Sequence, residues 1–295
     1  MSHPESHLSY IRRLCRDYRR SYEARRFPIQ PKYFILKAGL AMTLLLVGAF
    51  VALPVASLFL RSSPNGLLDS LKDPMVLDAL ALSMSTSCIT TIAVIIMGTP
   101  VAYINARFSY AGKEIIDSLI DLPVIMPPAV AGIALLMAFG RMGILGQHLN
   151  ARGISIAFTT LAVIVAQTFV SAPFFMRQAK TSFEDVDKTF ENAARTLGAT
   201  EVYTFFHVTL PIAFNGLVSG AIMTFARALG EFGATIMFAG NFQGRTQTMP
   251  LAIYTAMQGD LDAALFIAIL LVGVSFIVIV IVKLLTRRMY GNARD

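Results

Sequence analysis

Two charged residues, Arg227 and Glu231, lie in an otherwise apolar stretch of the sequence and are candidates for polar chemistry. They are four residues apart, so on a helix they share a face and can form an ion pair. A charged side chain inside an apolar segment is costly and usually faces a cavity or a protein partner. Arg227 could therefore supply positive potential to an anion path or gate, with Thr224 and Thr235 as hydrogen-bond donors. The alternative is a neutral structural pair that holds this segment against a neighbour.

Three prolines, Pro123, Pro127 and Pro128, lie in a second apolar segment. Each lacks a backbone N–H and disrupts the hydrogen-bond ladder of a helix. Carbonyl groups freed at membrane depth are tolerated only against protein or water. The segment is therefore predicted to be a bent or interrupted helix, with Pro127 and Pro128 in a transport path or gate. A packing kink with no role in transport explains these residues equally well.

A polar segment, residues 182–211, separates two apolar ones and carries helix start and stop signals. The start signals are a hydroxyl residue followed three residues later by a polar or acidic one, at Ser182 with Asp185 and at Thr189 with Asn192. Gly198 is typical of the position just after a helix. These signals predict a short helix, a turn at Gly198 and a second helix that enters the next apolar segment near Pro211.

The composition is that of a membrane protein. The chain has 295 residues, of which 55% are hydrophobic and only 15% charged, with a mean hydropathy of +0.63. In a typical soluble domain, about a quarter of the residues are charged. In a soluble chain, the net charge of +7 would suggest binding to nucleic acid. Because the basic residues cluster at the chain ends and in alternate loops, membrane orientation explains them better, and we expect no nucleic-acid binding.

Six apolar segments are long enough to cross a bilayer, which takes roughly 20 residues per helix. They are residues 38–60, 77–106, 119–139, 154–176, 212–238 and 261–285. Backbone groups in lipid need partners within their own segment, and the apolar runs are continuous rather than alternating, so helices are expected and a β-barrel is excluded. The sequence predicts an all-α, multi-pass protein of the cell membrane.

The positive charges predict that both termini are cytoplasmic. Lys and Arg number 9 through residue 37, 2 in residues 105–118, 4 in residues 177–209 and 4 after residue 282, against 5 in the opposite loops. We therefore divide the chain into a basic tail (1–37), a membrane domain (38–285) and a cytoplasmic C-terminal tail (286–295). The basic tail is too long for a signal peptide. It is interpreted as an interfacial helix held by anionic lipid, with contact to a cytoplasmic partner as the alternative.

The polar cytoplasmic segment resembles the EAA loop of ATP-binding-cassette (ABC) importer permeases. The similarity rests on Ala193-Ala194, then Gly198, then Val208-Thr209-Leu210-Pro211. In that family the loop contains a coupling helix that sits in a cleft of the ATPase subunit. The resemblance implies that the coupling residues are Glu191, Asn192, Ala193, Ala194, Arg195, Gly198 and Ala199. Asn192 stands where the family often has Glu, and Glu191 is one position too early.

Four further strings resemble the molybdate, tungstate and sulfate branch of these permeases, which implies the type I ABC importer fold. They are GTPVAY (98–103), LPVIMPP (122–128), GRMG (140–143) and RALGEFGAT (227–235). The resemblance implies a homodimer that moves molybdate or tungstate by alternating access, together with two ATPase subunits and an external binding protein. A sulfate or thiosulfate permease is the nearest alternative. The second alternative is a secondary anion carrier, and a membrane-embedded enzyme is the third.

The chain is expected to be a transport subunit rather than an enzyme. It lacks the G-x-x-x-x-G-K-[ST] phosphate-binding loop, so ATP and Mg²⁺ are expected on the partner ATPase. Its four histidines are scattered and its two cysteines, Cys15 and Cys88, lie in different environments. No metal site, disulfide, nucleophile or cofactor is therefore predicted for this chain.

Overall fold

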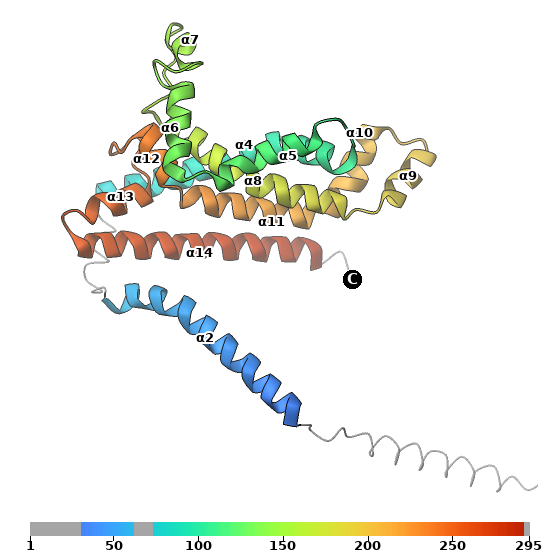
Figure 1. Ribbon diagram of the computed structural model, residues 1–295, viewed down its shortest axis with the longest axis horizontal. Helices are drawn as coiled ribbons and strands as arrows, with labels where there is room; N and C mark the ends of the chain where they lie inside the picture. The colour runs from blue at the N-terminus through green and yellow to red at the C-terminus, as the bar shows by residue number, and fades with distance from the viewer. Residues whose placement is uncertain (1–30, 62–72, 292–295) are drawn as a thin grey trace, which may run out of the picture. The chain divides into compact units, whose positions relative to one another are not determined.

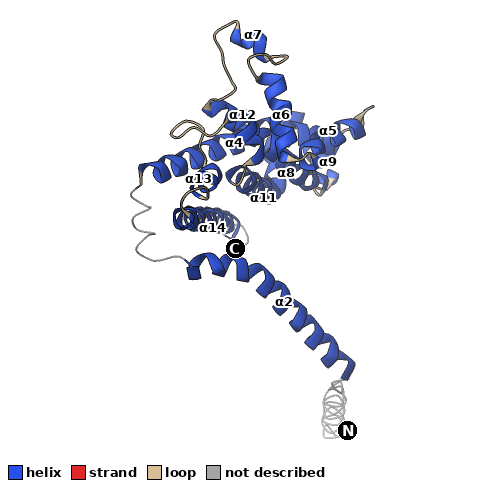
Figure 2. Ribbon diagram, turned by 60° about the vertical axis from the view of Figure 1, so that its left-hand side comes forward, coloured by secondary structure: helices blue, strands red, loops and turns tan. Residues whose placement is uncertain are grey.

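The computed structural model describes residues 31–61 and 73–291 of the chain. Most of the predicted basic tail, together with Cys15 and residues 292–295, lies outside the described residues. Throughout the described ranges the chain forms helices joined by loops, with no strand, which confirms the all-α prediction (Figure 2). The chain divides into two units, Met1–Leu60 and Arg61–Asp295, and each is described by itself.

The described part of the first unit is one long helix, α2 (Pro31–Arg61). Its stretch Lys37–Arg61 has a mean hydropathy of 2.4, and apolar side chains such as Leu45 and Phe50 are exposed. A helix that is apolar all round must be covered by lipid or protein. Because α2 begins at Pro31, the helix starts before the predicted boundary between tail and membrane domain at residues 37 and 38.

Four long helices run alongside one another in the second unit (Figure 1). They are α4 (Pro74–Arg107), α8 (Thr160–Glu184), α11 (Leu210–Leu229) and α14 (Leu261–Gly291). The face of α4 that is buried carries small residues about one turn apart, including Ala79, Ser83 and Gly98. A Cβ added at Gly98 would lie 2.9 Å from Cδ1 of Phe175 on α8. Small residues therefore set the close approach of α4 and α8.

Shorter helices complete the second unit. They are α5 (Lys113–Ile125), α6 (Pro128–Phe139), α7 (Gly146–Asn150), α9 (Lys188–Thr196), α10 (Glu201–Thr204), α12 (Gly233–Ala239) and α13 (Met249–Ala256). A π-helical turn, η1 (Phe205–Thr209), joins α10 to α11. α9 and α10 lie at one end of the unit, where α4 and α8 finish, and α7 and α13 lie at the other (Figure 1).

Among the described residues, five helical runs are long and apolar enough to cross a membrane, and α5 with α6 would make a sixth. This agrees with the predicted number of spans. The α5–α6 pair is bent by 115°, which confirms the predicted interruption of the proline-containing segment. α14 continues to Gly291, so the predicted boundary between residues 285 and 286 is not a helix end.

Two predicted spans are shifted in the structure. The fourth, predicted at 154–176, is α8 at Thr160–Glu184, and the fifth, predicted at 212–238, runs over Glu201–Leu229. A regular α-helix would place the ring of Pro211 against the carbonyl four residues earlier. The wider turn η1 ends two residues before Pro211, and the Leu210 N–H donates to the Phe205 carbonyl five residues back. The helical run therefore passes from α10 through Pro211 into α11, which confirms the predicted second helix that enters the apolar segment near Pro211.

Candidate functional site

Residues 185–209 form a helical hairpin at the end of the second unit where α4 and α8 finish, and we call it the α9–α10 hairpin. α9 is capped by Asp187, whose carboxylate accepts the Thr189 N–H at 2.8 Å. Hydrogen bonds from the backbone and the side chain of Thr189 hold the pKa of Asp187 below its usual value. The helix start predicted from Thr189 is therefore two residues late, and the start predicted at Ser182 is wrong. Ser182 lies within α8 and its hydroxyl donates to the Gln178 carbonyl.

The turn predicted at Gly198 is confirmed by its backbone geometry. Gly198 has φ of +88°, and its N–H donates to the Arg195 carbonyl at 2.9 Å. The Ala199 N–H reaches back to the Ala194 carbonyl at 3.0 Å, which satisfies a carbonyl at the end of α9. Positive φ is costly for residues with a Cβ and most costly for β-branched ones. The direction in which the chain leaves α9 therefore depends on glycine at this position.

A buried ion pair fixes the α9–α10 hairpin to the long helices. Arg107 at the end of α4 lies 2.9 Å from Glu191 of α9, and both side chains are buried. The Thr209 hydroxyl of η1 donates to the same Glu191 oxygen at 2.7 Å, and Arg107 also donates to the Val186 carbonyl at 2.9 Å. One carboxylate thus links α4, α9 and the start of α11.

Aromatic side chains reinforce this attachment beside the ion pair. The Tyr103 ring of α4 meets Phe205 edge-on at 4.7 Å between centroids and Phe183 at 5.5 Å. Aromatic pairs in such geometry add to the free energy gained by burying the rings. The hairpin is therefore held to α4 and α8 by apolar as well as charged contacts.

The predicted coupling residues divide between two faces of α9. Glu191 is only 4% exposed and faces the chain's own helices. Asn192, Ala193, Arg195 and Gly198 are exposed, whereas Ala194 and Ala199 are half-buried. The outer surface also carries two large apolar side chains, Phe190 at 56% and Leu197 at 89% exposed. α9 therefore turns Glu191 toward the chain's own helices and presents polar and apolar side chains on its outer face.

The predicted pair of Arg227 and Glu231 forms at the end of α11. Arg227 Nη1 lies 2.6 Å from Glu231 Oε2, and Glu231 is 1% exposed. The second oxygen, Oε1, accepts the Ala234 N–H at 2.8 Å, so the same carboxylate caps the start of α12. The predicted fifth span is therefore interrupted at residues 230–232, between α11 and α12.

The interruption beside Glu231 lies against the bend that follows α5. A Cβ added at Gly233 would lie 2.5 Å from Cβ of Pro128, and one added at Gly132 would lie 2.7 Å from the Ala234 carbonyl oxygen. Two glycines thus let the first turns of α6 and α12 touch. The structure therefore brings together two places where helices break, each of which leaves backbone groups outside a regular helical ladder.

The remaining predicted path residues occupy different environments around these breaks. Pro127 and Pro128 are exposed. Thr224 is buried, with its hydroxyl 3.5 Å from the Ser171 carbonyl of α8. Thr235 is buried, and its hydroxyl has no hydrogen-bond partner among the described residues. The threonines therefore face the chain's own interior, whereas the prolines and part of Arg227 are open to its surroundings.

Sequence reasoning missed Arg107, Thr209 and a polar network between α5 and α8. Arg107 looked like one more positive charge at the cytoplasmic end of a span. Its partner Glu191 is 84 residues away in the chain, and no local spacing indicates such a pair. Among the described residues, no cluster of three or more His, Cys, Asp or Glu side chains is arranged to hold a metal.

Long apolar helices, paired helix breaks and an exposed hairpin at one end define the fold of a type I ABC importer permease. The crystal structure of a bacterial ABC transporter involved in the import of the acidic polysaccharide alginate matches 94% of this chain and 99% of that chain, with a TM-score of 0.70 and 14% identity. The MetNI methionine ABC transporter matches 72% of this chain and 93% of that chain, with a TM-score of 0.55 and 18% identity. These likenesses show the fold.

The chain belongs to the family of binding-protein-dependent transport system inner membrane components, whose model matches residues 95–290. It is similar to the molybdenum transport system permease protein ModB of Mycobacterium tuberculosis, at 42% identity over 78% of this chain and 87% of that protein. It is also similar to ModB of Escherichia coli, at 37% identity over 71% of this chain and 93% of that protein. The chain is thus a multi-pass transport component of the plasma membrane.

The buried ion pair gives a prediction for the stability of the hairpin. Glu191→Gln keeps the size of the side chain but leaves Arg107 buried without a countercharge, which costs about 3–5 kcal/mol. We expect a lower Tm of the purified protein and faster amide hydrogen exchange in α9. Arg195→Gln is the matched control, because it removes the exposed pair of Arg195 with Glu201, which contributes about 0–1 kcal/mol. Equal effects of the two changes would show that the buried pair does not hold the hairpin.

The Arg227–Glu231 pair gives a second prediction, which separates its two interpretations. Because Glu231 is buried and uses both oxygens, Arg227→Gln should leave an unpaired buried carboxylate and destabilise the protein by about 3 kcal/mol. Glu231→Gln should be milder, because its amide oxygen still accepts the Ala234 N–H. The double variant should regain much of the lost stability, measured as Tm and as the yield of monodisperse protein. A normal Tm with impaired uptake in Arg227→Gln would instead place Arg227 in the transport path.

Proposed function

We propose that this chain is the membrane-spanning subunit of an ABC importer for molybdate. The observation that carries the proposal is the α9–α10 hairpin, which is exposed on one face and fixed by Glu191 to α4 and α11 on the other. Relatives at 37–42% identity are named molybdenum transport permeases, and this supports molybdate as the substrate. Tungstate is a secondary candidate because the two oxyanions carry the same charge and shape.

The proposed assembly contains two copies of this chain, two ATPase subunits and an external binding protein. The alginate transporter of the same fold is described in complex with a substrate-bound periplasmic protein, which supports a partner of that kind here. ATP and Mg²⁺ would bind to the ATPase subunits, and this chain would supply the route through the membrane. The coupling surface toward each ATPase would be formed by Asn192, Ala193, Ala194, Arg195, Gly198 and Ala199.

The arrangement of the helices explains how ATP-driven movement would reach the transport path. Closure of the ATPases would push the α9–α10 hairpin, and the Glu191 contacts would pass this push to α4 and to the start of α11. The helical run Glu201–Leu229 has 29 residues and spans about 40 Å, ending where α11 meets α12 beside Pro128. Rigid-body displacement of such a helix is a common way to open one side of a path and close the other.

The break region would supply the groups that an oxyanion meets on its way through. An ion path needs binding that is weak and repeated, since the ion must also leave. Pro127 and Pro128 are exposed at the bend, and Arg227 adds positive potential that Glu231 largely neutralises. Thr224 and Thr235 would join the path only in a conformation that uncovers them. The proposed gate therefore combines helix breaks with charges that are already paired.

The proposal is tested by uptake into proteoliposomes that contain this chain together with its ATPase and binding protein. We expect accumulation of radiolabelled molybdate that requires both ATP inside and the binding protein outside. Unlabelled tungstate should compete more strongly than sulfate. Uptake driven by an ion gradient without ATP would identify a secondary carrier, and stronger competition by sulfate would identify a sulfate permease.

Gly198→Val gives a prediction for the coupling turn in the same assay. Valine at φ of +88° should distort the end of α9, so that ATP hydrolysis continues while molybdate uptake per ATP falls at least severalfold. Gly259→Val is the control, because Gly259 has nothing within 4 Å of an added Cβ and no positive φ. Unchanged uptake per ATP in Gly198→Val would remove the turn from the coupling mechanism.

A further inference from the structure

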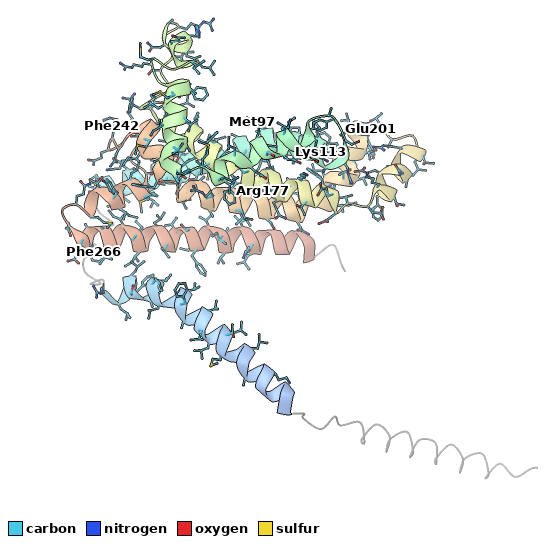
Figure 3. All side chains as sticks on the ribbon, in the orientation of Figure 1. Met97, Lys113, Arg177, Glu201, Phe242 and Phe266 are labelled. Atoms are coloured by element: carbon cyan, nitrogen blue, oxygen red, sulfur yellow. The ribbon has the colours of Figure 1, made fainter. Side chains whose placement is uncertain are left out.

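A polar pocket of about 250 Å³ lies between α5 and α8, near the hairpin end of the second unit. Its charged lining is formed by Asp117 and Asp121 of α5 and by Arg177 and Lys180 of α8, with Asn105 of α4 beside them. Figure 3 shows Lys113, at the start of α5, on the same side of the unit as Glu201 of the hairpin. The pocket has room for several water molecules.

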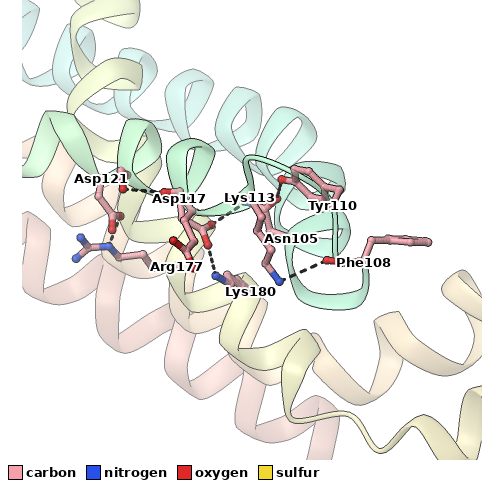
Figure 4. A network of polar contacts seen from close by, with 10 residues as sticks. Asn105, Phe108, Tyr110, Lys113, Asp117, Asp121, Arg177 and Lys180 are labelled. Carbon is pink, nitrogen blue, oxygen red and sulfur yellow. Dashed lines mark hydrogen bonds and ion pairs between the residues drawn. The ribbon is translucent and has the colours of Figure 1, made fainter.

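The four charges of the pocket form two ion pairs across the helices (Figure 4). Lys180 Nζ lies 2.7 Å from Asp117 Oδ2, and Arg177 Nε pairs with Asp121 Oδ1. Asp117 Oδ1 also accepts the Asn105 amide at 2.9 Å, and the Tyr110 hydroxyl donates to Asn105. The two cations are three residues apart and the two carboxylates four apart, so each pair projects from one face of its helix.

Charged contacts are a large part of what attaches α5 to the rest of the unit. Within α5, only Pro123 is buried, whereas Ile115, Leu119 and Ile125 are exposed. α5 is followed by the 115° bend into α6, so the pocket lies on the hairpin side of the interrupted span. In the proposed orientation, the pocket therefore lies on the cytoplasmic side of the bend.

We propose that this pocket is the cytoplasmic exit site for the oxyanion, in which Arg177 and Lys180 exchange their carboxylate partners for the substrate. The inference rests on the proposed function and adds specific residues to it. A tetrahedral dianion offers several acceptor oxygens, and guanidinium and ammonium groups on one face match it with charge-assisted hydrogen bonds. Asp117 and Asp121 compete with the anion for the same cations, and this competition keeps anion binding weak.

Competition by the carboxylates explains how the site would avoid trapping its substrate. Two free cations on one face would hold a dianion tightly and slow its release. With both cations paired, the four side chains carry no net charge and the oxyanion gains only the difference between two similar contacts. The carboxylates thus determine the rate of release, and removing one should convert a weak site into a strong one.

The alternative is that the ion pairs only attach α5 to α8. Both interpretations predict damage from Arg177→Gln, so that change alone does not separate them. They differ for Asp121→Asn, which frees Arg177 without removing it. A purely structural pair would then give weaker attachment and no gain in anion binding, whereas an exit site would bind the oxyanion more tightly.

The test uses the complete transporter in nanodiscs, without nucleotide and without the binding protein, and measures molybdate binding by equilibrium dialysis. We expect Asp121→Asn to bind molybdate roughly tenfold more tightly than the wild type. The double variant Asp121→Asn with Arg177→Gln should return to wild-type binding. Asp117→Asn, which frees Lys180, is an independent second variant with the same expected direction.

Glu201→Gln is the matched control, because it frees Arg195 of the hairpin, outside the pocket, in the same manner. Equal gains in Glu201→Gln and Asp121→Asn, or no gain in either aspartate variant, would overturn the exit site. Uptake per ATP by the wild type is measured in parallel. If wild-type uptake requires ATP but the aspartate variants show no gain, the exit site fails and the proposed function stands. If the wild type transports no molybdate, the proposed function itself fails.

Discussion

The carboxylate of Glu191 is the contact on which the hairpin end of the second unit depends. It accepts hydrogen bonds from Arg107 at the end of α4 and from Thr209 at the start of α11, while its own backbone lies in α9. Buried charges are retained only where they are paired and hydrogen-bonded, and breaking one side of such a pair is strongly destabilising. A short helix of nine residues, α9, has little stability of its own. Together with the aromatic contacts of Tyr103, this carboxylate therefore joins an otherwise weak surface helix to α4 and α11.

Helix interruptions form the second constraint, and glycine determines where they meet. A broken helix leaves backbone groups that lipid cannot satisfy, so two breaks are more stable next to protein than apart from it. Gly132 and Gly233 allow the first turns of α6 and α12 to approach to a distance that any Cβ would prevent. Glu231 then satisfies the Ala234 N–H and pairs with Arg227, so the polar groups of this region are largely neutralised within the chain.

Local chemistry is what the sequence predicts well here. Apolar run length predicted the number of spans, the prolines predicted the α5–α6 bend, and Gly198 and the four-residue spacing of Arg227 and Glu231 predicted a turn and an ion pair. Each of these depends on residues within one or two turns of one another. The start of α9 was predicted two residues late because Asp187 and Thr189 are both good N-cap residues. In the structure the Asp187 carboxylate accepts the Thr189 N–H, so the helix begins at Lys188. The π-helical turn before Pro211 was not predicted, since no residue pattern distinguishes one wide turn from the regular helix that was expected to enter the apolar segment there.

Long-range pairing is what the sequence could not predict. Arg107 and Glu191, or Lys180 and Asp117, come from segments whose own periodicity says nothing about one another. Glu191 was therefore predicted to be a coupling residue because its neighbours in the sequence resemble the coupling motif. On a helix, a shift of one position decides whether a side chain faces outward or inward, and Glu191 faces inward.

The polar sites share one electrostatic property, and it bears on how an anion transporter can be made from an apolar chain. Arg107, Arg227, Arg177 and Lys180 each lie beside a carboxylate of the same chain. Pairing lowers the cost of placing these cations among apolar helices, and it also prevents any one of them from holding an anion tightly. The sites differ in exposure, since the Arg107 pair is buried on both sides and the Arg177 pair is largely open. Because exchange of partners requires access, the buried pair suits transmission of movement and the open pair suits contact with the ion.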